Sequence, residues 1–120
     1  MKRVEFVGHR GQQILFLDFS NCSVPEILGT IKEAKAVIRE QPEQSLLTLS
    51  DVTDAAFNET VRIAMKEFTL HNKPYVKAAA VVGVTGLKRI IFDGVLLFSK
   101  RKMSAFDGLD PAKDWLVDQG

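Results

Sequence analysis

The sequence predicts an α/β fold: a single domain, residues 1–120, whose mixed, mainly parallel β-sheet is packed by about four helices. Short apolar runs alternate with segments in which apolar residues recur at helical spacing, and this alternation is typical of repeated β-α units. The 120-residue length suits one domain, and a hydrophobic content of 46% is ordinary for a chain that buries a core.

An antiparallel hairpin is expected at the N-terminus. The run "RVEFV" (residues 3–7) alternates between apolar and polar residues, which indicates a half-buried strand. "GHRGQ" supplies two glycines for a turn, and "QILFLDF" (residues 13–19) is an almost continuous apolar strand. The short turn predicts that the two strands pair with each other.

The clearest helix lies within residues 21–42. Ser23 and Glu26 match the capping box, Pro25 is tolerated in the first turn, and Pro42 ends the helix. "SLLTLS" (residues 45–50) follows as a short buried strand.

A second helix is expected over residues 57–71, with either Asp54 or Asn58 as its cap. The next strand is "YVKAAAVVG", and a third helix spans residues 86–98. "KMSAF" is the last strand, and a final helix begins at Asp110 as cap with Pro111 at its first position. The predicted order is β-β-α-β-α-β-α-β-α.

Four loops are expected to meet along one edge of this sheet, which we call the rim: residues 18–21, 50–54, 83–86 and 107–110. Open α/β sheets bind ligands beyond the carboxyl ends of their strands. The alternative is that the polar rim residues only cap helices and close turns. The candidate ligand-binding residues are Phe19, Ser20, Ser50, Asp51, Thr53, Phe57, Gly83, Thr85, Gly86 and Phe106.

The glycine turn "GVTG" (residues 83–86) invites comparison with phosphate-binding loops. No Gly-Lys-Ser/Thr follows it, and it is not G-x-G-x-x-G. Free amides at a helix N-terminus can hold an anion, yet Lys88 and Arg89 in the first turn oppose the helix dipole. We therefore interpret the turn chiefly as a corner of the rim.

The third predicted helix carries apolar residues on two sides. Phe92 and Leu96 fall opposite its core face, near Arg89, and this set of three is our candidate interface. The alternative is that the C-terminal helix or Trp115 covers the two apolar residues.

Other classes of site find little support in the sequence. No His/Cys cluster has metal spacing, no G-x-S-x-G elbow occurs, and we expect neither a metal nor a cofactor. Cys22 is the single cysteine and is expected to be a small packing residue. A net charge of +1 argues against nucleic acid as a partner. No signal peptide or transmembrane run is seen, and a cytoplasmic location is expected.

The strand ends "FLDFS" and "LLTLSDVTD", and the tail "KPYVKAAAVVGVTGLKRIIFDGVLLFSKRKMSAFDGLDPAKDWL", resemble the STAS (SpoIIAA-like) family, in particular its uncharacterised bacterial, Sec14-like branch. The resemblance implies a SpoIIAA-like fold. Signalling members of the family carry a phosphorylatable Ser or Thr after Asp at the helix that follows the third strand. Here Asp54 is followed by Ala55, Ala56 and Phe57, so that switch is not expected, and Phe57 suits the apolar ligand that a Sec14-like protein implies.

Three functions follow as hypotheses. The first is a non-enzymatic, regulatory binding module that binds a protein partner or associates with itself as a homodimer. The second is a carrier of a lipid or other apolar small molecule, which Phe19, Phe57 and Phe106 near the strand ends favour. The third is a nucleotide- or phosphate-binding protein or an enzyme that uses the rim aspartates.

Overall fold

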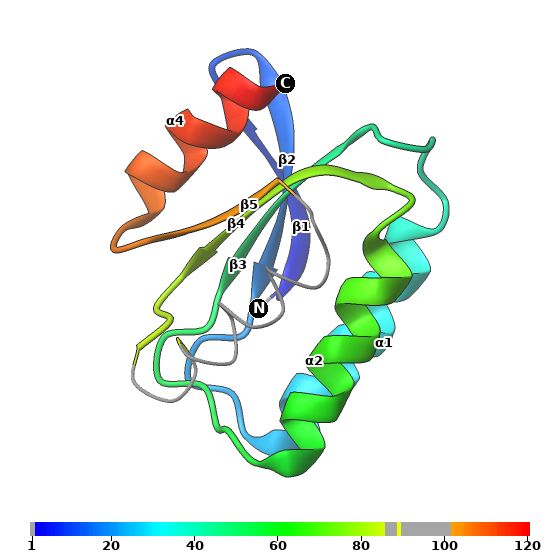
Figure 1. Ribbon diagram of the computed structural model, residues 1–120, viewed down its shortest axis with the longest axis vertical. Coiled ribbons are helices and arrows are strands. Elements are labelled where there is room, and N and C mark those ends of the chain that lie inside the picture. The colour runs from blue at the N-terminus through cyan, green and yellow to red at the C-terminus, as the bar shows by residue number, and fades with distance from the viewer. Residues whose placement is uncertain (1, 86–88, 90–101) are drawn as a thin grey trace.

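One five-stranded sheet in the order β1-β2-β3-β4-β5 organises the chain. The computed structural model describes residues 2–85, 89 and 102–120 (Figure 1). The predicted third helix, residues 86–98, lies outside the described part except for Arg89, which is helical. The described residues hold three helices with defined bounds, one fewer than the about four expected. The elements in chain order are β1 Val4–His9, β2 Gln12–Asp18, α1 Val24–Ile38, β3 Leu46–Asp51, α2 Glu59–Asn72, β4 Val76–Val82, β5 Met103–Phe106 and α4 Leu109–Gln119.

The predicted N-terminal hairpin is present. β1 pairs with β2 antiparallel, from Val4 opposite Leu17 to His9 opposite Gln12. Arg10 and Gly11 form the turn, with φ of 50° and 82°. Two left-handed residues in a two-residue loop are typical of the turn whose twist matches that of the flanking strands.

The sheet is mixed, because β1 pairs antiparallel with β2 whereas β2, β3, β4 and β5 pair in parallel. α1 and α2 lie side by side on one face of the sheet, and α4 covers the other (Figure 1). Side chains alternate along each strand, so the sheet separates two cores. Leu15, Leu17 and Phe19 belong to the core under α1 and α2, whereas Leu47 and Leu49 pack towards α4.

The helix starts agree only in part with the sequence-based boundaries. α1 has its predicted capping box, in which Ser23 and Glu26 exchange two hydrogen bonds. α2 begins at Glu59 and not at residue 57, because the side chain of Asn58 caps it by accepting from the N–H of Val61 at 2.9 Å. Phe57 consequently belongs to the preceding loop.

The predicted cap of the C-terminal helix is wrong. α4 starts at Leu109 with Gly108 as N-cap, and Asp110 lies inside its first turn. Pro111 is then the third helical residue. Its missing N–H is harmless there, because the first N–H groups of a helix have no partner within the helix.

Residues at the β1–β2 hairpin turn form ion pairs with acidic side chains of α4. His9 Nε2 and Asp114 Oδ1 are 2.7 Å apart, and the Arg10 guanidinium lies 3.8 Å from the same carboxylate. The hydrogen bond with His9, then the charges of His9 and Arg10, lower the pKa of Asp114.

This lowered pKa predicts acid sensitivity of the α4 contact. A carboxyl whose pKa is lower in the folded state stabilises the fold above its unfolded pKa of about 4, and the contribution disappears as pH falls through the folded pKa. Asp114→Asn should therefore lower the thermal midpoint at about pH 6, with a difference that vanishes towards about pH 2. Asp107→Asn is the control, since exposed Asp107 pairs with no described residue. If Asp114→Asn lowers the thermal midpoint by the same amount at every pH, the charge of Asp114 is not the cause of the loss.

Candidate functional site

The first two rim loops repeat one local structure. Asp18 ends β2 and its Oδ1 accepts from both the N–H and the hydroxyl of Ser20. Asp51 ends β3 and its Oδ1 accepts from the N–H and the hydroxyl of Thr53, at 3.0 and 2.6 Å. Because Asp18 and Asp51 are register partners, the two turns lie next to each other. Oδ1 of each carboxylate thus serves as a turn acceptor, as expected for Asp in such loops.

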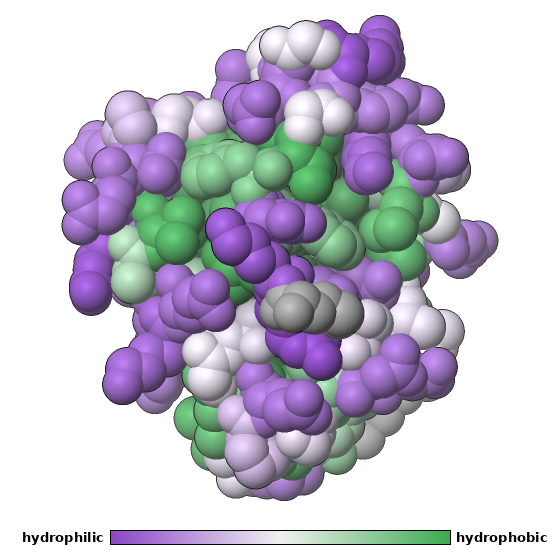
Figure 2. Space-filling model, turned by 180° about the vertical axis from the view of Figure 1, so that it is seen from behind, coloured by the Kyte–Doolittle hydropathy of each residue, from purple (hydrophilic) through white to green (hydrophobic). Residues whose placement is uncertain are grey.

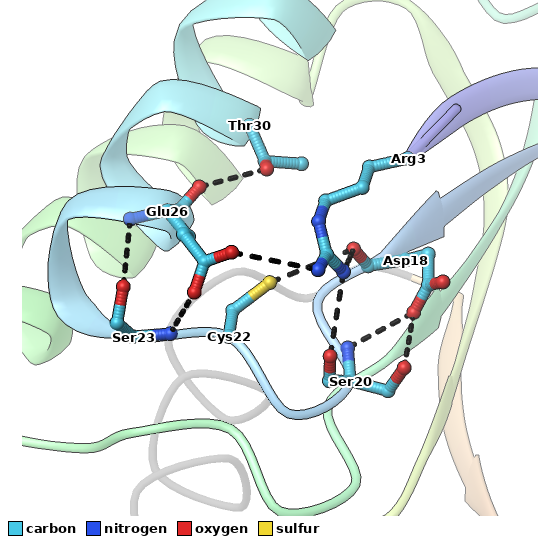
Figure 3. Close-up of polar contacts among 7 residues, drawn as sticks. All are labelled: Arg3, Asp18, Ser20, Cys22, Ser23, Glu26 and Thr30. Atoms are coloured by element: carbon cyan, nitrogen blue, oxygen red, sulfur yellow. Dashed lines mark hydrogen bonds and ion pairs between the residues drawn. The ribbon is translucent and has the colours of Figure 1, made fainter. Parts of the chain in front are cut away.

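Arg3 joins the first of these turns to α1 (Figure 3). Its guanidinium donates to the carbonyls of Asp18 and Ser20, at 3.2 and 3.3 Å, and lies 3.6 Å from the Glu26 carboxylate. The hydrogen bond from the Ser23 N–H is the largest cause that lowers the pKa of Glu26, and Arg3 adds to it. Burial raises the pKa of Cys22, whose thiol lies within this loop, as suits a packing residue.

Gly83 meets the second turn at close range. Its φ is 87°, and a Cβ placed there would lie 2.4 Å from Thr53 Oγ1 and 2.6 Å from the Thr53 backbone nitrogen. The loops after β3 and β4 are therefore in contact, as the rim predicts. Thr85 is exposed at the end of the described segment, and Gly86 lies outside it.

An apolar pocket lies between α2 and the sheet, below the rim, with a volume of about 150 Å³. Three predicted site residues line it: Phe19, Ser50 and Phe57. Phe19 is 1% exposed and packs edge-on against Phe68, with ring centroids 6.4 Å apart. The remaining apolar lining comes from α2, its preceding loop and the neighbouring strands, including Leu17, Val52, Ala55, Ala56, Val61, Met65, Ala79, Val81, Val84 and Met103.

Phe106 is not part of this pocket. It lies on the opposite face of the sheet, under α4, with its ring centroid 5.6 Å from that of Trp115. Alternation along β5 turns Met103 towards the pocket and Phe106 away from it. The sequence analysis chose the aromatic residue of this strand and missed the methionine.

The polar members of the pocket lie at different depths. Arg62, Lys66, Thr69 and Asn72 come from α2, and Arg62 pairs with Glu59 on the exposed side of that helix. Thr48 and Ser50 come from β3, in the sheet itself. The two cations are therefore near solvent, and the hydroxyls of Thr48 and Ser50 are on the sheet side of the pocket.

The candidate interface is largely outside the described residues. Phe92 and Leu96 fall there, and Arg89 is exposed. Elsewhere, hydrophobic side chains reach the surface in separate areas between hydrophilic ones, as the view from behind shows (Figure 2). The large ones with the greatest exposure are Phe6, Leu28, Ile63 and Leu70. Self-association through Phe92 and Leu96 stays a prediction.

No family model matches the sequence, and no curated protein matches it either. A search of solved structures finds the crystal structure of an uncharacterised protein of the DUF3478 family from Shewanella loihica PV-4, described as having a SpoIIAA-like fold. The TM-score is 0.72 over 94% of this chain and 91% of that one, at 14% sequence identity.

The chain has a SpoIIAA-like fold. The fold that the sequence resemblance implied is therefore confirmed. None of the helices in the described residues has the length and apolar character needed to cross a membrane. Likewise, residues 2–85, 89 and 102–120 contain no group of three His, Cys, Asp or Glu side chains that could hold a metal ion.

Proposed function

We propose that this SpoIIAA-like protein is a non-enzymatic binding protein whose ligand is an apolar small molecule held between α2 and the sheet. The observation that carries the proposal is the pocket of about 150 Å³ lined by Phe19, Phe57, Val61 and Met65. Ligand sites are typically concave and mostly apolar, with a few polar groups that orient the ligand.

The rim aspartates have a structural role that is compatible with a binding protein. The carboxylates of Asp18 and Asp51 each accept two hydrogen bonds within their own turns. These bonds all go to Oδ1 and give each carboxylate a structural role in its turn, which suits a rim that shapes the entrance to a binding site.

Filling the pocket tests the proposal. Ala79 lies on β4 at the pocket and is 6% exposed, so Ala79→Leu would occupy part of its volume. Toluene is a suitable probe, because an apolar cavity of about 150 Å³ holds benzene. We expect saturable toluene binding by methyl NMR in the wild type, weakened at least about tenfold in Ala79→Leu, a loss of about 1.4 kcal/mol.

Ala36→Leu is the matched control, because it adds the same atoms on the exposed side of α1. It should bind toluene as the wild type does. If Ala79→Leu does not fold, Ala56→Leu blocks the same pocket from the loop before α2. Absence of saturable binding in the wild type, or equal binding in a folded pocket-filling variant, would refute the proposal.

A further inference from the structure

Thr48 is buried in the pocket, and its hydroxyl has no hydrogen-bond partner among the described residues. Thr48 is 5% exposed, and its neighbours across the sheet are Leu15 on β2 and Ala79 on β4, whose side chains cannot hydrogen-bond. Within the described part of the chain no group bonds to this hydroxyl. It therefore differs from the majority of buried polar side chains, which are paired.

The position of Thr48 in a strand explains why it is unpaired. Thr30 is similarly buried in α1 and donates to the carbonyl of Glu26 at 2.8 Å, and Thr69 in α2 donates to that of Met65 at 2.9 Å. A helical threonine reaches the carbonyl four residues back. In a central strand the neighbouring carbonyls serve the sheet ladder and the side chain stands away from them, so the Thr48 hydroxyl points into the pocket.

Water is a poor match for this position. A buried water molecule typically makes about three hydrogen bonds. Ser50 is the next residue on the same face of β3, and its hydroxyl is displaced along the strand by roughly 7 Å. One water molecule cannot span that separation, and the apolar lining residues Leu17, Val61 and Met65 offer it no hydrogen bond. The other uncharged polar lining residues, Thr69 and Asn72, come from α2, across the pocket from β3.

We infer that the ligand of this pocket is a molecule about the size of a substituted benzene ring that carries one uncharged hydrogen-bonding group, such as an alcohol or a phenol, paired with Thr48. The inference rests on the proposed function and adds the chemical class of the ligand. The size follows from the volume of about 150 Å³. The group is uncharged because none of the described residues on the sheet side of the pocket carries a charge, and burying an unpaired ion is strongly unfavourable.

Two probes of nearly equal size test this, phenol and toluene, each titrated into the wild type and Thr48→Val by methyl NMR. Valine keeps the shape and β-branching of threonine and removes the hydroxyl. Thr48→Val should weaken phenol relative to toluene by about tenfold, the effect of one hydrogen bond in a buried site. The ratio between probes within each protein cancels any general effect of the substitution on the pocket.

The outcomes separate the inference from the proposed function. If both probes bind and Thr48→Val changes their ratio less than about twofold, the role of the hydroxyl is refuted while the pocket stands. If neither probe binds the wild type, the proposed function fails as well. Thr48→Ser, which keeps a hydroxyl, should retain the wild-type preference, and Thr48→Ala should lose it, so the test remains decisive if Thr48→Val is unstable.

Discussion

Replacing Gly83 by alanine should lower the free energy of unfolding by about 2–5 kcal/mol. Two effects add. Alanine is strained at the φ of 87°, and its Cβ would lie 2.4–2.7 Å from Thr53 atoms, two of which belong to the backbone. Backbone atoms cannot move aside as the end of a flexible side chain does. Chemical denaturation of the purified variant measures the loss directly.

Two other glycines separate these effects. Gly11 has a φ of 82° but nothing within 4 Å of its added Cβ, so Gly11→Ala should show strain alone, about 1 kcal/mol. Gly29 lies in α1 with an open position, and Gly29→Ala should stabilise by about 0.5–1 kcal/mol. A loss in Gly83→Ala no larger than in Gly11→Ala would show that the β3 and β4 loops are not in the contact described.

Truncation of Phe19 to alanine should cost about 3–5 kcal/mol. The ring is 1% exposed, lies directly beyond β2 and packs against Phe68. It forms one wall of the pocket, so its removal enlarges a cavity that already exists. Saturating toluene should recover part of the lost stability, because a ligand that binds only the folded state stabilises it in proportion to its occupancy.

Phe6→Ala provides the comparison for this loss. Phe6 is 43% exposed on the edge strand β1 and does not line the pocket. Its truncation should cost at most about 1 kcal/mol and should show no recovery with toluene. Equal losses for the two phenylalanines, or equal recovery, would mean that Phe19 does not form the pocket wall.

Much of the fold is predicted by local sequence patterns such as helix caps and apolar runs. The Ser23–Glu26 capping box marks the start of α1, and the same two bonds are found in the structure. The run of apolar residues in β3 and the small residues of β4 predict strands buried on both faces, as they are. The rim follows in turn, because parallel strands must end at the same edge.

The pocket lies beyond what such signals reveal. The strand "MSAF" does not show which of Met103 and Phe106 faces α2, because that depends on register and on which face each helix covers. Thr48 reads as a residue with good strand propensity, and its burial without a partner emerges only once its neighbours are known. The start of α2 was misplaced because Asp54 and Asn58 are equally good caps by residue type.

The location of bound toluene in the wild-type protein tests the central claim most directly. The probe's protons should give intermolecular NOEs to the methyl groups of Val61, Met65 and Met103, which line the pocket from α2 and β5. NOEs from saturating toluene only to exposed Leu28 or Leu70, or to Val117 on the buried side of α4, would contradict it.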